Sequence, residues 1–530
     1  MKKPIIVLLL LFCFAQQMGA QNELNWVYFT NKPQAPMALL KGQLALGERA
    51  VENRLKRNVA FDELDVAVES SYVNDIRDLG LEVVMVSRWL NAVLVKGDLP
   101  VALYEKPFVK RVEAHVLRYK ALAEVDKLAK TTALNYGQST QQIQLLYGEA
   151  PHNRGFTGRG MRIAVLDAGF LNVNQLAAFD SLRSENRIVS TFNFVNNQPN
   201  VYSSGGTHGT GVLSTMAANI PGSLVGTAPH AEYVLLTSEN TSTETPAEEY
   251  NWLKAAEFAD SLGCDVINSS LGYYEFDDAS DNYTYNDLDG KTTIVTQAAD
   301  WASKKGILVV NSAGNEGMSS WGRIIAPCDG DSVLCVGGVS LNGNYVRFSS
   351  RGPSADGRVK PNVVGPAADV KGVTNSASVV GMNGTSFSSP IIAGLAACIW
   401  QAYPNKNNFE ILKAIEQSAS RAQNPDSLMG YGIPNFSSIE DILGTYGESE
   451  SSLLTFVWRA NTRQFCFSGL KNGEYQMEVW TLNGKRLMEG TFNSNGEEQV
   501  VETGLDLPNQ ILLRLKGAGQ YKVWKMQQTP

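Results

Sequence analysis

Histidine is scarce in this chain of 530 residues, which contains only four. Apart from one N-terminal run, no segment approaches the length that spans a bilayer, so we expect no transmembrane segment and a soluble mature protein. Charged residues make up only 18% and hydrophobic residues 44%, which is typical of folded rather than disordered chains. The formal net charge of −8 argues against a nucleic-acid partner, which favours a basic surface.

Cysteine is also sparse, and its spacing to histidine matches no zinc site. Cys264 and Cys398 lie in apolar runs and are expected to be buried. Cys328 and Cys335 flank a turn signal, Asp329-Gly330-Asp331, and an exported protein either bridges them or leaves them free.

The N-terminus indicates export. Met1-Lys2-Lys3 precedes an apolar run, Ile5 to Ala15, and the small residues Gly19-Ala20 follow, so we predict a signal peptide over residues 1–20. The alternative, a membrane anchor, would need a longer apolar run.

Three patterns divide the rest of the chain. Residues 21–133 mix short strands and helices and predict a small α+β unit. The strands of this unit are expected at 27–29, 81–86 and 92–95, and its helices at 44–55 and 71–79. It ends in a linker rich in Lys and Ala, Lys120 to Lys130. Residues 134–445 alternate strands with helices and predict an α/β domain with a parallel sheet between helices; strands are expected at 161–166, 265–268 and 307–310, and helices at 247–262 and 292–305. Residues 450–530 contain only strand signals, with Asn472-Gly473 and Asn483-Gly484 as hairpin turns, and predict a small β-sandwich.

The most informative motif is Asn383 to Pro390, which contains Gly384-Thr385-Ser386 before an apolar helical run. A serine at a helix N-terminus lies beside free N–H groups and the positive end of the helix dipole. A serine that attacks a carbonyl needs such a place, because the attack creates an oxyanion. The same motif also serves as an ordinary helix cap.

An activated serine needs an imidazole, and the imidazole needs a carboxylate. Of the four histidines, His208 lies in a glycine-rich setting, Gly206-Thr207-His208-Gly209-Thr210-Gly211. Asp167 directly follows a predicted strand, at the edge where parallel sheets build their sites. Asn315, in Ser312-Ala313-Gly314-Asn315, can donate a hydrogen bond to an oxyanion. Taken singly, each residue also fits a cap, a turn or a structural histidine.

The four segments together resemble the subtilisin-like serine proteases, the subtilases. The order Asp, His, Ser is theirs, and the resemblance covers about Gly137 to Ile442; it rests on Ile163-Ala164-Val165-Leu166-Asp167, His208-Gly209-Thr210-Gly211-Val212, Ala313-Gly314-Asn315, Gly384-Thr385-Ser386, Asn268-Ser269-Ser270-Leu271-Gly272, Gly226-Thr227-Ala228-Pro229 and Phe348-Ser349-Ser350-Arg351-Gly352-Pro353.

This resemblance implies a role for each matching residue. Ser386 would be the nucleophile, His208 the general base and acid, and Asp167 the group that orients the imidazole. Asn315 and the backbone N–H of Ser386 would form the oxyanion hole. The remaining positions would bind substrate: Ser270, Leu271 and Gly272 as an edge strand for the substrate backbone, and Gly314 and Glu316 beside the primary specificity pocket.

Two features, Glu316 and the loop at residues 286–290, each allow two interpretations. Glu316 either favours a basic substrate side chain or is a solvated rim charge. Residues 286–290, Asn-Asp-Leu-Asp-Gly, offer oxygen ligands for a structural calcium, although an ordinary solvated loop also fits and no cofactor is needed for the chemistry.

The flanking units complete the hypothesis. Residues 21–133 resemble a subtilase propeptide, an inhibitor and folding chaperone cleaved off between about Val116 and Tyr136, or else a retained domain. Residues 450–530 resemble the sorting domains of type IX secretion substrates, from which Leu507-Pro508-Asn509-Gln510 departs; a carbohydrate- or surface-binding sandwich is the alternative. We therefore expect a secreted, monomeric serine endopeptidase made as a zymogen, extracellular or on the cell surface after passing the periplasm. Its expected partners are a protein or peptide substrate and its own propeptide, which acts as an intramolecular inhibitor. An inactive subtilase scaffold that binds surfaces is the alternative.

Overall fold

The computed structural model describes residues 24–115, 134–203, 206–444, 455–459, 463–482, 484–504, 507–508, 510–517 and 520–527. The predicted signal peptide and the predicted linker lie outside these residues. The chain divides into two compact units, Met1–Pro33 with Ala67–Leu117, and Gln34–Val66 with Arg118–Pro530.

The described residues of the first unit form a four-stranded antiparallel sheet with two helices, which confirms the α+β prediction. Its elements, in chain order, are β1 (Leu24–Phe29), α3 (Ser70–Asp78), β2 (Glu82–Ser87), β3 (Ala92–Lys96), α4 (Val101–Tyr104) and β4 (Val109–His115). The strand order is β2-β3-β1-β4. This βαββαβ arrangement is the split βαβ motif. It has its own apolar core, in which Val27, Ile76 and Val93 are fully buried.

Residues 34–66, which we call the arm, are inserted between β1 and α3. The arm contains α1 (Ala35–Lys41), α2 (Glu48–Arg57) and a short 3-10 helix, η1 (Glu63–Asp65). The helix predicted at 44–55 starts later, because Gly47 is extended and caps α2, and it ends at Asn58, which has a left-handed φ of 56°. The four-stranded motif is complete without the arm.

A seven-stranded parallel sheet forms the centre of the second unit, as predicted. Its order is β13-β12-β11-β10-β5-β9-β6. The bounds are β5 (Arg162–Asp167), β6 (Ile188–Asn193), β9 (Glu232–Thr237), β10 (Val266–Ser269), β11 (Leu308–Ser312), β12 (Val333–Val339) and β13 (Val363–Pro366). The chain runs from β5 toward β6 and β9 on one side and then to β10 on the other. This reversal creates a crevice at the carboxyl ends of β5 and β10, where open α/β sheets place their ligands.

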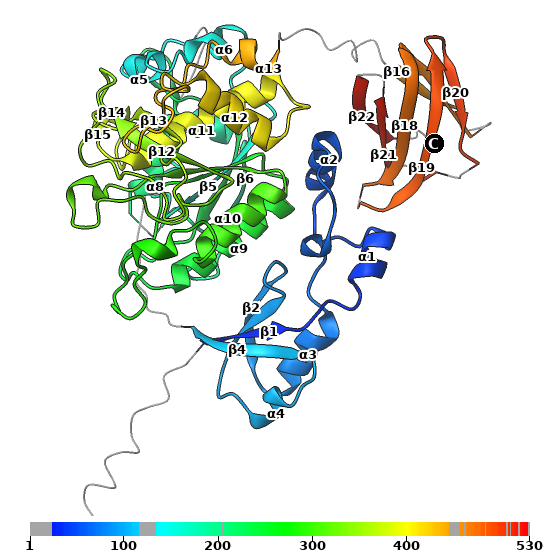
Figure 1. The fold of residues 1–530 in the computed structure, drawn as a ribbon, viewed down its shortest axis with the longest axis horizontal. Coiled ribbons are helices and arrows are strands. Elements are labelled where there is room, and N and C mark those ends of the chain that lie inside the picture. Colours follow the sequence, from blue (N-terminus) through cyan, green and yellow to red (C-terminus); the bar gives the residue numbers. More distant parts are fainter. Residues whose placement is uncertain are drawn as a thin grey trace, which may run out of the picture. The chain divides into compact units, whose positions relative to one another are not determined.

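Helices cover both faces of the sheet (Figure 1). One face carries α9 (Ala247–Ser261) and α10 (Ile294–Lys304), and the other carries α8 (His208–Ala217) and the buried α11 (Thr385–Ala402). The remaining elements are peripheral: α5 (Thr140–Gln144), α6 (Glu149–Asn153), α7 (Asp180–Ser184), α12 (Asn408–Ser418), α13 (Ile439–Leu443), η2 (Tyr285–Asp287), η3 (Glu316–Met318) and the two-stranded pairs β7 (Asn219–Ile220) with β8 (Leu224–Val225) and β14 (Val370–Gly372) with β15 (Val380–Met382).

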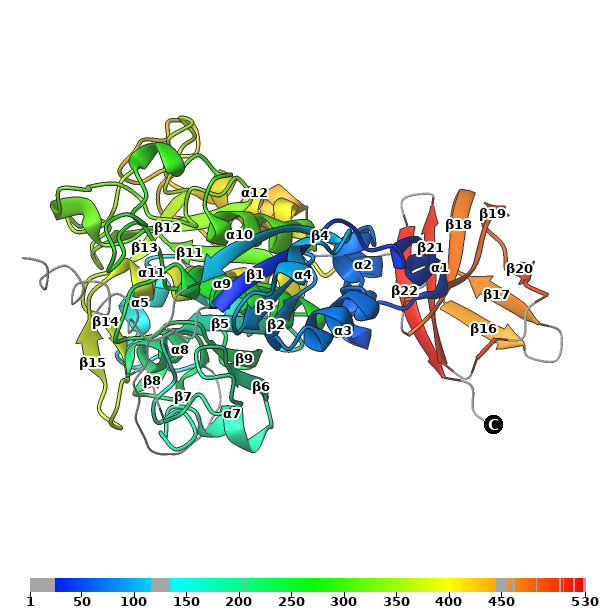
Figure 2. The same ribbon diagram turned by 90° about the horizontal axis from the view of Figure 1, so that it is seen from below.

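The C-terminal region is a pair of antiparallel sheets, visible as two layers in Figure 2. One sheet has the order β16-β17-β20 and the other β19-β18-β21-β22. The bounds are β16 (Thr455–Arg459), β17 (Gln464–Ser468), β18 (Asn472–Thr481), β19 (Arg486–Asn495), β20 (Gln499–Glu502), β21 (Gln510–Gly517) and β22 (Gln520–Gln527).

One of the two predicted hairpin turns in this region is wrong. Asn472 and Gly473 begin β18 and pair with Asn495 and Ser494 instead of forming a turn. The turn prediction failed because pairing with β19 overrules the local Asn-Gly signal, and Gly473 accommodates its φ of 143° in the strand. The other prediction is confirmed at Gly484, which lies in the turn between β18 and β19.

The cysteines separate into two kinds. Cys328 and Cys335 form a disulfide, with their Cα atoms 5.0 Å apart. Cys264 and Cys398 are free and buried, as expected. Within the described part of the chain, no helix combines the length and the apolar character needed to cross a membrane.

Candidate active site

Asp167 and His208, which lie far apart in the sequence, are hydrogen bonded. Asp167 is the last residue of β5, and His208 is the first residue of α8. Nδ1 of His208 lies 2.8 Å from Oδ1 of the fully buried Asp167. Gly209 allows this approach, because a Cβ there would lie 2.9 Å from the Cβ of Asp167 and 2.4 Å from the carbonyl oxygen of Gly169. The glycine beside the histidine therefore brings α8 against the end of β5.

The carboxylate changes how the imidazole titrates. Desolvation around the ring would lower the pKa of His208, but the charge and the hydrogen bond of Asp167 outweigh it and raise the pKa above its ordinary value. Because Asp167 accepts at Nδ1, the neutral ring carries its proton there. The Nε2 lone pair is then available as a base.

Ser386 lies in the first turn of α11, as the motif predicted. Its N-cap, Gly384, has a φ of 140° and a ψ of 150°, a conformation that is open essentially to glycine alone. N–H groups in the first turn of a helix have no acceptor within the helix. The side chain Oγ of Ser386 lies 3.5 Å from the carbonyl oxygen of Ser270. Within the described residues it is not hydrogen bonded to His208, although the His208 ring lies 5.9 Å from that of the adjacent Phe387. Catalytic hydrogen bonds are often long without substrate.

A second contact joins the nucleophile helix to the segment after β10. Pro390 lies inside α11 and has no N–H, so the carbonyl of Ser386 lacks its usual helical donor. The hydroxyl of Ser270 donates to this carbonyl at 2.8 Å. Next to it, Ser389 donates to the side chain of Asn268 at 2.9 Å. These bonds fix the start of α11 against the carboxyl end of β10.

Asn315 also faces the start of α11. Its Oδ1 accepts hydrogen bonds from the backbone N–H of Thr385 at 2.9 Å and from the Thr385 hydroxyl at 3.2 Å. The same hydroxyl lies 3.1 Å from the carbonyl of Gly314. Since Oδ1 is occupied by Thr385, the Nδ2 donor of this exposed side chain is left to bind a ligand.

The predicted substrate-binding edge follows β10 directly. Ser270, Leu271 and Gly272 belong to none of the ladders in the described residues, and pairing resumes at Tyr273 with a single bridge to Ala326. The carbonyl of Leu271 accepts from the Asn311 amide at 2.9 Å. Sequence reasoning missed Asn311; a polar residue inside the fully buried strand β11 was the available signal.

Glu316 lies next to an aromatic pair that the sequence analysis did not single out. The Tyr274 hydroxyl donates to Glu316 Oε2 at 3.1 Å, and the Tyr274 ring stacks on Trp321 at 4.6 Å between centroids. Burial and the Glu316 carboxylate both raise the pKa of Tyr274. Glu316 is therefore positioned by a hydrogen bond rather than freely solvated.

The loop considered for calcium uses its carboxylates internally. Asp287 accepts from the N–H and hydroxyl of Thr284, both at 2.7 Å, and Asp289 accepts from the N–H groups of Lys291 and Thr292. In the described ranges, no group of three or more candidate ligand side chains gathers as a metal site.

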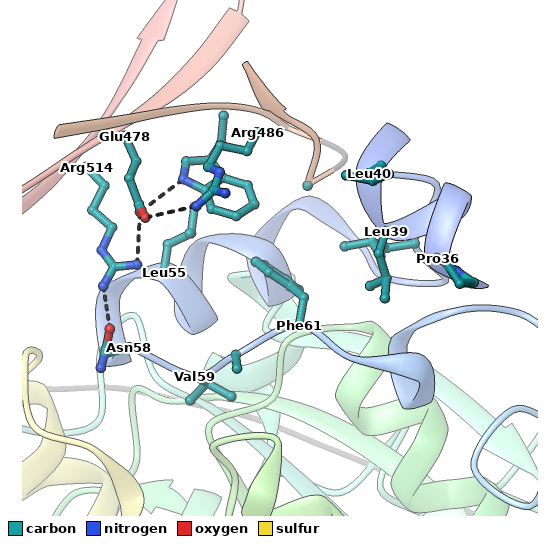
Figure 3. Close-up of a pocket in the computed structure, with 14 residues that line it drawn as sticks. Pro36, Leu39, Leu40, Leu55, Asn58, Val59, Phe61, Glu478, Arg486 and Arg514 are labelled. Atoms are coloured by element: carbon teal, nitrogen blue, oxygen red, sulfur yellow. Dashed lines mark hydrogen bonds and ion pairs between the residues drawn. The ribbon is translucent and has the colours of Figure 1, made fainter. Parts of the chain in front are cut away.

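A cavity of about 860 Å³ lies elsewhere, lined by residues of the arm and of β18, β19 and β21 (Figure 3). None of the predicted site residues lines it. Its carboxylate, Glu478, is already paired with Arg514 at 3.0 Å and with Arg486 at 3.7 Å. This cavity is distinct from the site at Asp167, His208 and Ser386.

Comparison with known proteins gives two family matches. The Subtilase family (Peptidase_S8) matches residues 158–432, and the Peptidase S8 propeptide domain of Bacteroidota matches residues 24–132.

Individual relatives agree with the first match. Subtilisin E of Bacillus subtilis (strain 168) is 30% identical over 303 residues, which cover 57% of this chain and 70% of the relative. Subtilisin of Bacillus pumilus is 30% identical over 281 residues, which cover 52% of this chain and 90% of that protein. Among solved structures, MycP1 from Mycobacterium smegmatis aligns with a TM-score of 0.47 and 20% identity, over 61% of this chain and 89% of MycP1.

Proposed function

The chain belongs to the subtilase family and is a serine endopeptidase with a propeptide domain, and from this premise we propose that Asp167, His208 and Ser386 carry out its peptide hydrolysis. The observation that supports this assignment best is the Asp167–His208 hydrogen bond, at the same sheet edge as the first turn of the Ser386 helix. The chemistry draws its base, nucleophile and oxyanion donors from the protein itself and requires no cofactor.

In the proposed acylation step, Ser386 Oγ leaves the Ser270 carbonyl and gives its proton to His208 Nε2 as it attacks the scissile carbonyl carbon. Asp167 stabilises the imidazolium that forms and keeps its orientation. The tetrahedral intermediate then collapses, the C–N bond breaks, and Nε2 returns the proton to the leaving amine. In deacylation, Nε2 of His208 takes a proton from water as the water oxygen attacks the acyl carbon. The bond from that carbon to Ser386 Oγ then breaks, Nε2 returns the proton to Oγ, and the acid product leaves.

The developing oxyanion is held by donors that face the start of α11. We assign this role to Asn315 Nδ2 and to the backbone N–H of Ser386. The hydrogen bond from Thr385 to Asn315 Oδ1 orients the amide before substrate arrives. Such preorganisation is effective because no reorientation is needed during the reaction.

The substrate is proposed to bind as an extended strand along Ser270, Leu271 and Gly272, with Gly314 on the far side of the acyl pocket. Glu316, held by Tyr274, gives that pocket a carboxylate. This charge favours a basic side chain on the acyl side of the cleaved bond, and it favours such substrates more strongly than a solvated rim charge would.

The propeptide domain supports synthesis as a zymogen with an intramolecular inhibitor. We further propose that the chain is exported through its signal peptide, that autocleavage falls in the linker between Val116 and Tyr136, and that the C-terminal sandwich serves in type IX sorting. A structural calcium at residues 286–290 and a monomeric state stay predictions.

Labelling with a fluorophosphonate probe tests the proposed nucleophile. Full-length wild type that has matured should be labelled at Ser386, and Ser386→Ala should be neither labelled nor processed. A matured wild type that resists labelling would favour the inactive scaffold instead. Ser388→Ala, another serine of the same helix, is the matched control and should keep labelling.

A further inference from the structure

The arm, residues 34–66, cannot be ordered by its own core. The apolar cluster formed by the arm's own described residues contains only three buried residues, Ala35, Ala38 and Val66, whereas Val51 and Leu55 are buried against Leu512 of the C-terminal sandwich. Nor does the four-stranded motif on either side need it, because that motif is complete from β1, α3, β2, β3, α4 and β4. By its contacts the arm groups instead with the unit that contains both the protease domain, residues 134–445, and the C-terminal sandwich. An inserted segment of this kind needs a partner surface to be folded at all.

Three arginines of the arm meet two buried aspartates of the protease domain. Arg54 binds both carboxylate oxygens of Asp260 at 2.6 and 2.8 Å, and Arg57 binds Asp265 at 2.5 Å. Arg49 reaches the other oxygen of Asp265 at 2.6 Å. Burial alone would raise the pKa of Asp265, but Arg57 and Arg49 outweigh it and lower the pKa.

The charges also pair in the opposite direction. Lys305 of the protease domain, which caps α10, binds Asp62 at 2.6 Å and Asp65 at 3.2 Å, both in the arm. Asp65 accepts a further bond from Arg54 at 2.5 Å, so that the two sets of charges form one network. Because cations and anions are contributed by both sides, the network fits this arm more closely than a single-sign patch would.

Backbone contacts accompany the charges. The N–H of Gly47 donates to the carbonyl of Ser261 at 2.8 Å, and Asn53 donates to the carbonyl of Gly263 at 3.0 Å. A Cβ at Gly263 would lie 2.6 Å from the backbone nitrogen of Ala50. The Arg57 guanidinium lies over the Trp400 ring, 4.0 Å from its centroid. The two surfaces therefore match in shape as well as in charge.

The burial of these ion pairs determines how much they contribute to the stability of the contact between the arm and the protease domain. Exposed ion pairs contribute little, but here the Arg54, Asp65 and Asp260 side chains are 2%, 0% and 4% exposed. Removing one partner of such a set leaves a buried charge without compensation, which is strongly destabilising.

The network lies at the opposite end of the sheet from the candidate catalytic residues. Asp265 immediately precedes β10 and Lys305 precedes β11, whereas Asp167 ends β5 and Ser386 faces the end of β10. The six residues of β5 separate the two ends by roughly 17 Å, at about 3.3 Å per residue. A polypeptide bound at one end leaves the chemistry at the other end unobstructed.

We propose that the arm is a second docking element of the propeptide, which binds the amino ends of the central strands through this network and keeps the propeptide bound after the linker is cut. The claim that the propeptide stays bound after cleavage of the linker rests on the proposed function, whereas the docking of the arm does not. The occupant of this surface is the chain's own residues 34–66.

Hydrogen exchange on the full-length Ser386→Ala chain tests the docking. Asp260→Asn is the informative variant, because it weakens the contact across the network and leaves the pair of Arg54 and Asp65 within the arm intact. Amides of α2 should exchange at least about tenfold faster in this variant. Glu257→Gln is the matched control, since Glu257 lies on the same helix and pairs there with Lys254 at 2.6 Å. Equal α2 exchange in the two variants, with α11 unchanged, would overturn the proposal.

A cleavage site for an exogenous protease, inserted into the linker of the same Ser386→Ala chain, tests retention. After cutting, the propeptide should co-elute with the protease domain, and Asp260→Asn should raise its dissociation rate at least about tenfold relative to Glu257→Gln. Equal release rates in both variants would refute retention through the arm. Both experiments measure exchange or dissociation rather than catalysis. A chain that is already cut on a denaturing gel before the protease is added would show that the proposed nucleophile is wrong, and this outcome is distinct from a failure of the docking.

Discussion

Ser270→Ala should destabilise the start of α11, because it removes the donor that replaces the missing N–H of Pro390. The bond from the Ser270 hydroxyl to the Ser386 carbonyl is 2.8 Å long, and the two residues are only 6% and 8% exposed. Water therefore has little access to the abandoned carbonyl. Leaving a buried acceptor unsatisfied costs about 1–3 kcal/mol, which is the expected loss of unfolding free energy.

The cause can be isolated with a second substitution. Pro390→Ala supplies an N–H at the position that normally donates to residue 386 of a helix. In this background the Ser386 carbonyl keeps a donor, so Ser270→Ala should cost less than about 1 kcal/mol. Urea unfolding of full-length Ser386→Ala chains, followed through the transition that contains α11, measures all four members of the cycle.

Ser388→Ala is the control for the same cycle. Ser388 is also buried on α11, but its hydroxyl donates to the Thr385 carbonyl, which Pro390 does not affect. Its cost should be equal with Pro or Ala at position 390. If Ser270→Ala also costs the same in both backgrounds, within about 0.5 kcal/mol, the proposed exchange of donors is wrong.

Three other predictions concern the site and its support. Asp167 raises the pKa of His208, and the base must be neutral, so activity should fall as the pH drops through a value above the ordinary histidine pKa. Asp167→Asn should move this limb of the kcat/KM profile to lower pH and reduce turnover by about 10⁴-fold. A limb that does not move would contradict the assignment. Asn315→Ala should lower kcat by roughly 100- to 1,000-fold with little change in KM, a magnitude taken from subtilisin rather than from this structure, and a loss confined to KM would remove Asn315 from the oxyanion hole. Replacing Cys328 and Cys335 together by Ser should reduce the unfolding free energy by about 2.5 kcal/mol for their short loop, to be measured by urea unfolding; equal stability with and without the bridge would contradict this.

The central sheet and its candidate site could be predicted from the sequence because the signals are local. Buried parallel strands are continuous apolar runs, so the bounds of β5, β10 and β11 were found to within two residues. A polar residue that ends such a strand has a predictable place at the sheet edge. Asp167 was assigned in this way, whereas its hydrogen bond to His208 also required the family resemblance.

What escaped prediction depends on contacts between distant segments. The arm's arginines read as ordinary exposed charges of an amphipathic helix, and nothing local indicates that Asp260 and Asp265 lie opposite them. The bond between Ser270 and the Ser386 carbonyl is hidden in the same way, since it joins residues 116 positions apart. Asn472-Gly473 failed for the opposite reason, because a strong local turn signal was overruled by strand pairing with Asn495 and Ser494.

The insertion of the arm inside the propeptide has a consequence for the order of events during maturation. Only short connectors, at Pro33–Gln34 and Val66–Ala67, join the arm to the four-stranded motif on either side. While the arm is bound, the four-stranded motif stays tethered to the protease domain. Its effective concentration for binding that domain is then in the millimolar range, whatever the concentration of the protein in solution. Activity would then appear only after a delay that follows cleavage of the linker. The rate at which α2 dissociates from the protease domain would set the length of this delay.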